Sequence, residues 1–144
     1  MKNRVVVLHG VNLDVLDRRP SGIYGGLSLT LLEQRISHFA HELGLEVRFF
    51  QSNHEGEFVE ELHRSPDYAD GLILNPGAWT HYAWALRDAV EVTGLPAVEI
   101  HLSDPDAREE WRHLSVLADV VVARVKGEGP DGYRTALTRL KEAW

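Results

Sequence analysis

The chain has 144 residues, a formal net charge of -7 at pH 7, and ordinary shares of hydrophobic (44%) and charged (26%) residues. This length and balance suit one globular domain, and the acidic surplus argues against non-specific nucleic-acid binding, which needs a basic face. The chain has no cysteine, which excludes disulfides, a thiolate nucleophile and cysteine-ligated metals.

The N-terminal part of the chain begins with a strand pattern. The continuous β-branched run 5–8 predicts a strand buried on both faces. It is too short for a signal peptide or a membrane span, so we expect a cytoplasmic protein with no membrane partner. A capping box from Thr30 to Glu33 predicts the start of a helix that Gly44 ends. Alternating residues over 45–49 predict the second strand.

Strands and helices continue to alternate along the rest of the chain. The remaining predicted elements are a helix over 52–63, a strand over 72–74, a helix over 80–92, a strand over 97–100, a short helix over 103–112, a strand over 120–122 and a helix over 133–144. Five β-α units predict an α/β fold: a parallel sheet with helices on both faces, in one domain spanning 1–144. Ligands of such sheets bind at the carboxyl ends of the strands.

Polar groups follow most of the predicted strand ends. Asn12 follows the first strand, a block over 75–81 follows the third, and His101 ends the fourth. The loop 18–25 carries two arginines and Tyr24 among proline and glycines, which are turn residues. A phenol has a pKa near 10, and a fixed cation lowers it by about 1–3 units. Each group alone also fits a solvated loop or a cap, but their convergence at one sheet edge favours a site with a movable lid over about 17–26.

Several kinds of chemistry are missing from these loops. The chain has no Walker A motif, no dinucleotide fingerprint, no carboxylate cluster at a strand end and no zinc-type histidine spacing. Its three lysines lie outside the polar cluster, which argues against a Schiff base. We therefore expect acid-base chemistry on an anionic, polyhydroxylated small molecule, with no metal and no cofactor.

Four blocks of the chain together resemble the type II 3-dehydroquinate dehydratase family. The blocks are Gly10–Leu13 with Ile23–Gly25, Phe50–Glu57, Asn75–His81 continuing to Ala89, and His101–Ser103 with Ala107–Arg112. The resemblance implies a flavodoxin-like three-layer sandwich with a five-stranded parallel sheet, and a homododecamer built from trimers. It also implies dehydration of 3-dehydroquinate to 3-dehydroshikimate by anti elimination through an enolate, in the shikimate pathway of aromatic amino-acid biosynthesis, without cofactor or imine.

The same resemblance implies a role for each matching residue. Tyr24 would be the base that removes the proton beside the ketone, and Arg19 would hold it as phenolate. Asn12 would stabilise the enolate, and His101 would protonate the departing hydroxyl. The implied substrate-binding groups are Asn75, His81, Arg112, the backbone amides of Leu102 and Ser103 at the start of a helix, and, from a neighbouring subunit, Asp88.

Some positions depart from the family pattern. Asp17 stands where the family usually has glycine, and we expect it either to pair with Arg18 and alter lid closure or to weaken the positive charge felt by Tyr24. Asp104 places a negative charge near the expected carboxylate site. Bulky aromatics at 79, 82 and 84 are candidates for a subunit interface. The alternatives to a dehydratase are a catalytically silent paralogue and a flavodoxin-like module that binds a small anion.

Overall fold

The protein is built on a five-stranded, all-parallel sheet in the order β2-β1-β3-β4-β5, described here from a computed structural model of residues 1–144. The strands are β1 (Arg4–His9), β2 (Glu46–Gln51), β3 (Gly71–Asn75), β4 (Ala97–His101) and β5 (Ala123–Lys126). The helices are α1 (Ser21–Tyr24), α2 (Leu29–Glu42), α3 (Glu55–Arg64), α4 (Trp84–Thr93) and α5 (Gly132–Glu142). This strand order is the flavodoxin-like one, so the predicted fold class is confirmed.

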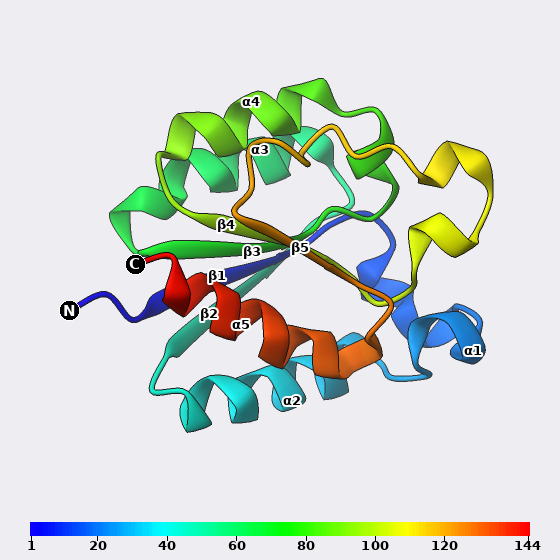
Figure 1. The fold of residues 1–144 in the computed structure, drawn as a ribbon, viewed down its shortest axis with the longest axis horizontal. Helices are drawn as coiled ribbons and strands as arrows, with labels where there is room; N and C mark the ends of the chain where they lie inside the picture. The colour runs from blue at the N-terminus through cyan, green and yellow to red at the C-terminus, as the bar shows by residue number, and fades with distance from the viewer.

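Two layers of helices cover the sheet. Helices α3 and α4 lie on one face, and α2 and α5 lie on the other (Figure 1). Successive residues of β1 supply opposite cores: Val5 and Val7 pack with α2 and α5, whereas Val6 and Leu8 pack with α3 and α4. Burial on both faces explains the unbroken apolar run of β1. No helix has the length and apolar character needed to cross a membrane.

The strand order reverses beside β1. The chain passes from β1 outward to β2 and then returns across β1 to β3, so the loops after β1 and β3 diverge. At the base of these loops the backbones of Gly10 and Pro76 lie in close contact. A side chain at position 10 would not fit, since its Cβ would lie 2.6 Å from the carbonyl oxygen of Pro76. The reversal therefore opens a crevice at the carboxyl edge of the sheet, with the 18–25 loop beside it.

The predicted fifth strand lay three residues too early. The ladder pairs Val98 with Ala123, so β5 begins after the valine run 120–122. Val120 and Val121 instead pack against the core under α3 and α4 as the chain approaches the sheet. The apolar run 120–122 thus predicted partial burial correctly. A segment that packs against the core before the strand and a buried strand have the same sequence pattern, so the run could not distinguish them.

The predicted helix 103–112 is also wrong. Two short 3-10 turns, Pro105–Ala107 and Glu110–Arg112, occupy this segment. Arg108 between them is extended, with φ -120° and ψ -161°, and it breaks the helical path. Its side chain reaches Tyr24, so a long-range contact overrides the local cap and proline signals.

Three other helix starts differ from the sequence prediction. Ser28, not Thr30, caps α2, because the Ser28 hydroxyl accepts a hydrogen bond from the amide of Leu31 at 3.2 Å. Helix α3 begins at Glu55, three residues later than expected. The helix expected from residue 80 is a 3-10 turn over Gly77–His81, and α4 follows only at Trp84.

Candidate active site

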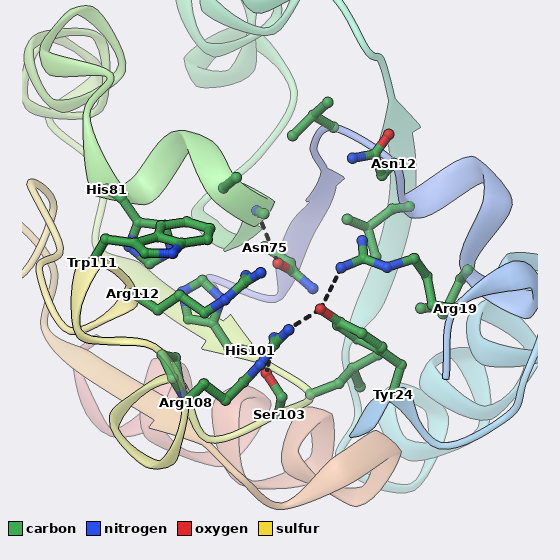
Figure 2. Close-up of a pocket in the computed structure, with 17 residues that line it drawn as sticks. Asn12, Arg19, Tyr24, Asn75, His81, His101, Ser103, Arg108, Trp111 and Arg112 are labelled. Carbon is green, nitrogen blue, oxygen red and sulfur yellow. Dashed lines mark hydrogen bonds between the residues drawn. The ribbon is translucent and has the colours of Figure 1, made fainter. Parts of the chain in front are cut away.

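A cavity of about 280 Å³ opens at the carboxyl edge of the sheet. The loops after β1, β3 and β4 supply its walls, as Figure 2 shows. Of the predicted site residues, those that line it are Asn12, Arg19, Tyr24, Asn75, His81, His101, Leu102, Ser103 and Arg112. Asp88 is the exception: it lies exposed on α4, outside the cavity.

The Tyr24 phenol lies between two cations. Tyr24 ends the single turn of α1, which Gly25 closes in the left-handed conformation with φ 89°. The phenol oxygen accepts hydrogen bonds from the guanidinium of Arg19 and, at 2.7 Å, from that of Arg108 (Figure 2). The Arg19 guanidinium also lies over the ring, 4.1 Å from its centroid. Two guanidinium groups therefore donate charge-assisted hydrogen bonds to one phenol oxygen.

Arg108 was not among the site residues predicted from the sequence, yet its side chain bonds to Tyr24 in the cavity. The sequence placed it in a helix after the fourth strand, where its direction was undefined. Its guanidinium also donates to the Ser103 hydroxyl at 3.3 Å, so it links the lid tyrosine to the end of β4. The sequence offered one signal for this role: Arg108 follows β4 at the edge of the sheet where ligands bind.

His101 is backed by a buried carboxylate. Glu99 is fully buried in β4, and its Oε2 lies 2.6 Å from the Nε2 of His101. The hydroxyl of Ser115 and the guanidinium of Arg124 donate to the other carboxylate oxygen at 2.7 and 3.1 Å. With Nε2 engaged, Nδ1 is the nitrogen of His101 that remains for the cavity. Glu99 was not singled out in the sequence, although its spacing of two residues from His101 places both side chains on the same face of β4.

The stability of the protein should depend on Glu99 at acidic pH. Burial alone would raise the pKa of Glu99, but hydrogen bonds and the charges of His101 and Arg124 lower it to about 2, against 4.5 ordinarily. A lowered pKa adds stability that is complete above 4.5 and is lost as the pH falls towards 2. We expect the free energy of unfolding to drop over this interval in the wild type.

Urea unfolding from pH 6 to pH 2 would measure this loss. The Glu99→Gln variant, which cannot titrate there, should start less stable at pH 6 and fall less steeply. Parallel curves for the two proteins would show that Glu99 does not contribute in this way.

Neutral donors and acceptors line the wall opposite the lid. The Asn75 Oδ1 accepts from the amide of Gly77 at 3.1 Å, which leaves its Nδ2 as a donor. The Nδ1 of His81 lies 2.7 Å from the carbonyl oxygen of Leu114 and donates to it, which leaves Nε2 free. Burial, with nearby positive charge, lowers the pKa of His81 below its usual value, so its ring is neutral at pH 7. Such groups suit the hydroxyls of a ligand.

Arg112 reaches the cavity from the second 3-10 turn. Its guanidinium stacks on Trp111, 4.0 Å from the ring centroid, and pairs with Glu109. Trp111 also packs edge-on against His81, with ring centroids 5.3 Å apart. This stack holds one cation on the side of the cavity away from Tyr24.

The expected anion site at a helix start has no helix behind it. Leu102 and Ser103 lie at the end of β4, and only a three-residue turn follows. Asp104 caps that turn by accepting from the amide of Asp106 at 3.1 Å, and it does not line the cavity. A helix dipole therefore does not contribute here, and any anion at Ser103 depends on backbone amides and on Arg108.

Two other expectations about the departures are corrected. Asp17 is exposed and forms no ion pair with Arg18; the neighbouring Arg19 bonds to Tyr24. Trp79 is buried in the core, edge-on to Phe58 at 5.5 Å, and is not available to a partner.

The strand order and the pairing of Tyr24 and His101 in one small cavity are typical of a flavodoxin-like α/β enzyme that performs acid-base chemistry. The family model described as dehydroquinase class II matches residues 3–141. The chain therefore belongs to the class II dehydroquinase family.

Individual relatives agree with this assignment. Proteins named 3-dehydroquinate dehydratase from Bacillus licheniformis and Desulforudis audaxviator are 47% and 48% identical over 134 residues, covering 93% of this chain and 92% and 89% of theirs. A crystal structure of a type II dehydroquinase from Butyrivibrio crossotus superposes with a TM-score of 0.93 at 34% identity, covering 97% of this chain and 98% of that one.

Proposed function

We propose that this protein is a hydro-lyase that converts 3-dehydroquinate into 3-dehydroshikimate and water. The observation that carries the proposal is the Tyr24 oxygen held by two guanidinium groups in the same cavity as His101. The names of its relatives supply the substrate. A stabilised phenolate is a base, and a histidine backed by a carboxylate can hold a proton for a leaving group.

The first step is proton abstraction. The Tyr24 phenolate takes the proton from the carbon beside the substrate ketone, and the electron pair of that C–H bond forms an enolate. Arg19 and Arg108 stabilise the phenolate beforehand. Asn12, at the turn after β1, stabilises the negative charge that develops on the enolate oxygen, in the manner of an oxyanion donor.

The second step is loss of the hydroxyl. The enolate electrons re-form the ketone and the new C=C bond while the C–O bond breaks. His101 protonates the departing oxygen, which leaves as water, and the proton on Tyr24 later returns to His101 through solvent. Glu99 stabilises the imidazolium between turnovers. The base comes from α1 and the acid from β4, so an anti elimination places the substrate between them.

Substrate binding uses the rest of the wall. Asn75, His81 and Arg112 bind hydroxyls, and the backbone amides of Leu102 and Ser103 bind the carboxylate. No lysine lines the cavity, and the mechanism proceeds without an imine or a cofactor. Residues 17–26 act as a lid in one catalytic domain spanning 1–144.

We also propose that the protein works as a homo-oligomer, a dodecamer of four trimers, in the cytoplasmic shikimate pathway. Asp88 on α4 is exposed and reaches the site of a neighbouring subunit in this arrangement. Tyr82 and Trp84, each 59% exposed near the start of the same helix, are apolar surface that a second copy would cover. Light scattering tests the assembly, and a monomer would exclude this role for Asp88.

One assay tests the proposed reaction. Purified protein is incubated with 3-dehydroquinate, and the ultraviolet absorbance of the conjugated enone product is followed. We expect product formation, with no inactivation when borohydride is added together with substrate. A folded protein that binds a product analogue but forms no product would instead be a silent paralogue or a small-anion-binding module.

A further inference from the structure

The segment after β2 has no role in the reaction described above, yet it touches the site. The adjacent turn after β1 contains Asn12, whose φ is 71°. Asn12 is the one non-glycine residue of the chain with a positive φ. A left-handed backbone conformation costs free energy for any residue with a side chain, although less for asparagine than for most. Such a conformation therefore persists only where surrounding contacts stabilise it.

Asn53 supplies that restraint. Its side-chain Oδ1 accepts the backbone N–H of Asn12 at 2.8 Å, across 41 residues of sequence. The side-chain amide of Gln51 donates to the same oxygen at 3.3 Å and to the carbonyl of Gly10 at 3.2 Å. The last residue of β2 and a residue of the following loop thus bond to the carbonyl of Gly10 and to the N–H of Asn12.

The other end of the Asn53 amide reaches the base of the lid. Its Nδ2 donates to the carboxylate of Asp14 at 3.0 Å. Asp14 lies in the 3-10 helix Leu13–Arg18, which runs directly into Arg19. A single amide group therefore joins the turn of Asn12 to the segment that carries the lid.

The orientation of this amide is fixed by its partners. An ionised carboxylate only accepts hydrogen bonds, so the NH₂ group of Asn53 must face Asp14. A backbone N–H only donates, so the carbonyl oxygen must face Asn12. A neutral amide at position 14 could pair with either end of the Asn53 amide. In this chain the carboxylate allows one arrangement.

We propose that Asn53 is a positioning residue for the dehydration: it holds Asn12 in the left-handed conformation that aims its side chain at the enolate, and it fixes the root of the lid through Asp14. The catalytic consequence rests on the proposed function; the structural consequence for Asn12 does not. Asn53 itself does not line the cavity.

Removal of the amide is the first test. Since a small misplacement of a group that acts in the transition state costs rate, Asn53→Ala should lower kcat by about 10–100-fold and change KM by less than about 3-fold. His54→Ala, on the same exposed loop, removes a side chain with no contact to the site and should retain wild-type kcat. Wild-type kcat in folded Asn53→Ala would overturn the proposal.

A reciprocal exchange separates positioning from general loop damage. Asn53→Asp places a second carboxylate against Asp14 and should lower kcat at least as much as alanine does. Adding Asp14→Asn places an amide donor at position 14 against the new carboxylate at position 53. The kcat of the double variant should therefore recover to within about 5-fold of the wild type. Asp14→Asn alone should remain close to wild type. A double variant no faster than Asn53→Asp would contradict the proposed arrangement.

Amide hydrogen exchange gives a readout that does not need turnover. The Asn12 N–H should exchange about 10-fold or more faster in Asn53→Ala than in the wild type, as measured by NMR, with unchanged exchange in the core strands. Equal exchange in both proteins would overturn the proposal. If the wild type showed this protection but formed no product from 3-dehydroquinate, the proposed function would fail and the positioning role would stand.

Discussion

Replacement of Tyr24 by phenylalanine should reduce turnover of 3-dehydroquinate by about 10³-fold or more and leave ligand binding nearly unchanged. The phenylalanine ring retains the shape of the lid turn and its packing beside Arg19 and Arg108. It lacks the oxygen that the two guanidinium groups hold, so no base faces the proton beside the ketone. The enone assay measures kcat, and calorimetric titration with a product analogue measures binding.

A matched control for this variant is Tyr82→Phe. Tyr82 is 59% exposed and lies outside the cavity, so loss of its hydroxyl should not change kcat. Residual turnover of Tyr24→Phe within 10-fold of the wild type would assign proton abstraction to another group, since general-base catalysis contributes about 10²–10⁴-fold.

Replacement of Arg108 by alanine should reduce kcat by about 10²–10³-fold, the usual loss when one donor to a charged centre is removed. The phenol of Tyr24 would keep Arg19 as its single cation. Arg108→Lys retains the charge without the planar fork of donors that reaches both Tyr24 and Ser103, so it should recover only part of the rate.

Arg18→Ala is the control for Arg108→Ala. It removes the same charge from the lid itself, but Arg18 is exposed and does not line the cavity, so kcat should stay near wild type. Equal losses in the two variants would show that general positive charge, and not the contact with Tyr24, supports the reaction.

Local signals located most of the fold correctly. The β-branched run of β1 and the apolar spacing of α2 identified elements whose burial follows from their own few residues, such as Val5, Val7 and Ile36. Beyond three misplaced helix starts, the larger errors fall in the segment between β4 and β5. There, proline and cap residues favoured a helix, but packing of Val120 and Val121 and the extended backbone of Arg108 produced turns and a later strand.

The residues predicted for the site divide in the same way. Tyr24 and Arg19 are five residues apart on one loop, so sequence alone could pair them. Arg108 meets the same phenol across 84 residues, and this contact requires the ends of β1 and β4 to be at one edge of the sheet. No neighbouring residue in the sequence indicates that the Arg108 side chain points towards Tyr24.

The α/β pattern, the polar groups at the strand ends and the four blocks that identify the family can all be read from the amino-acid sequence. These properties depend on short-range periodicity, turn chemistry and ordered motifs, which are all readable within a few residues. Three contacts appear only once the chain is folded: Glu99 with His101, Arg108 with Tyr24, and Asn53 with Asn12. The last two are contacts between loops that the parallel strand order brings to one edge, and the first depends on the burial and hydrogen-bond partners of a strand side chain, none of which a local pattern encodes.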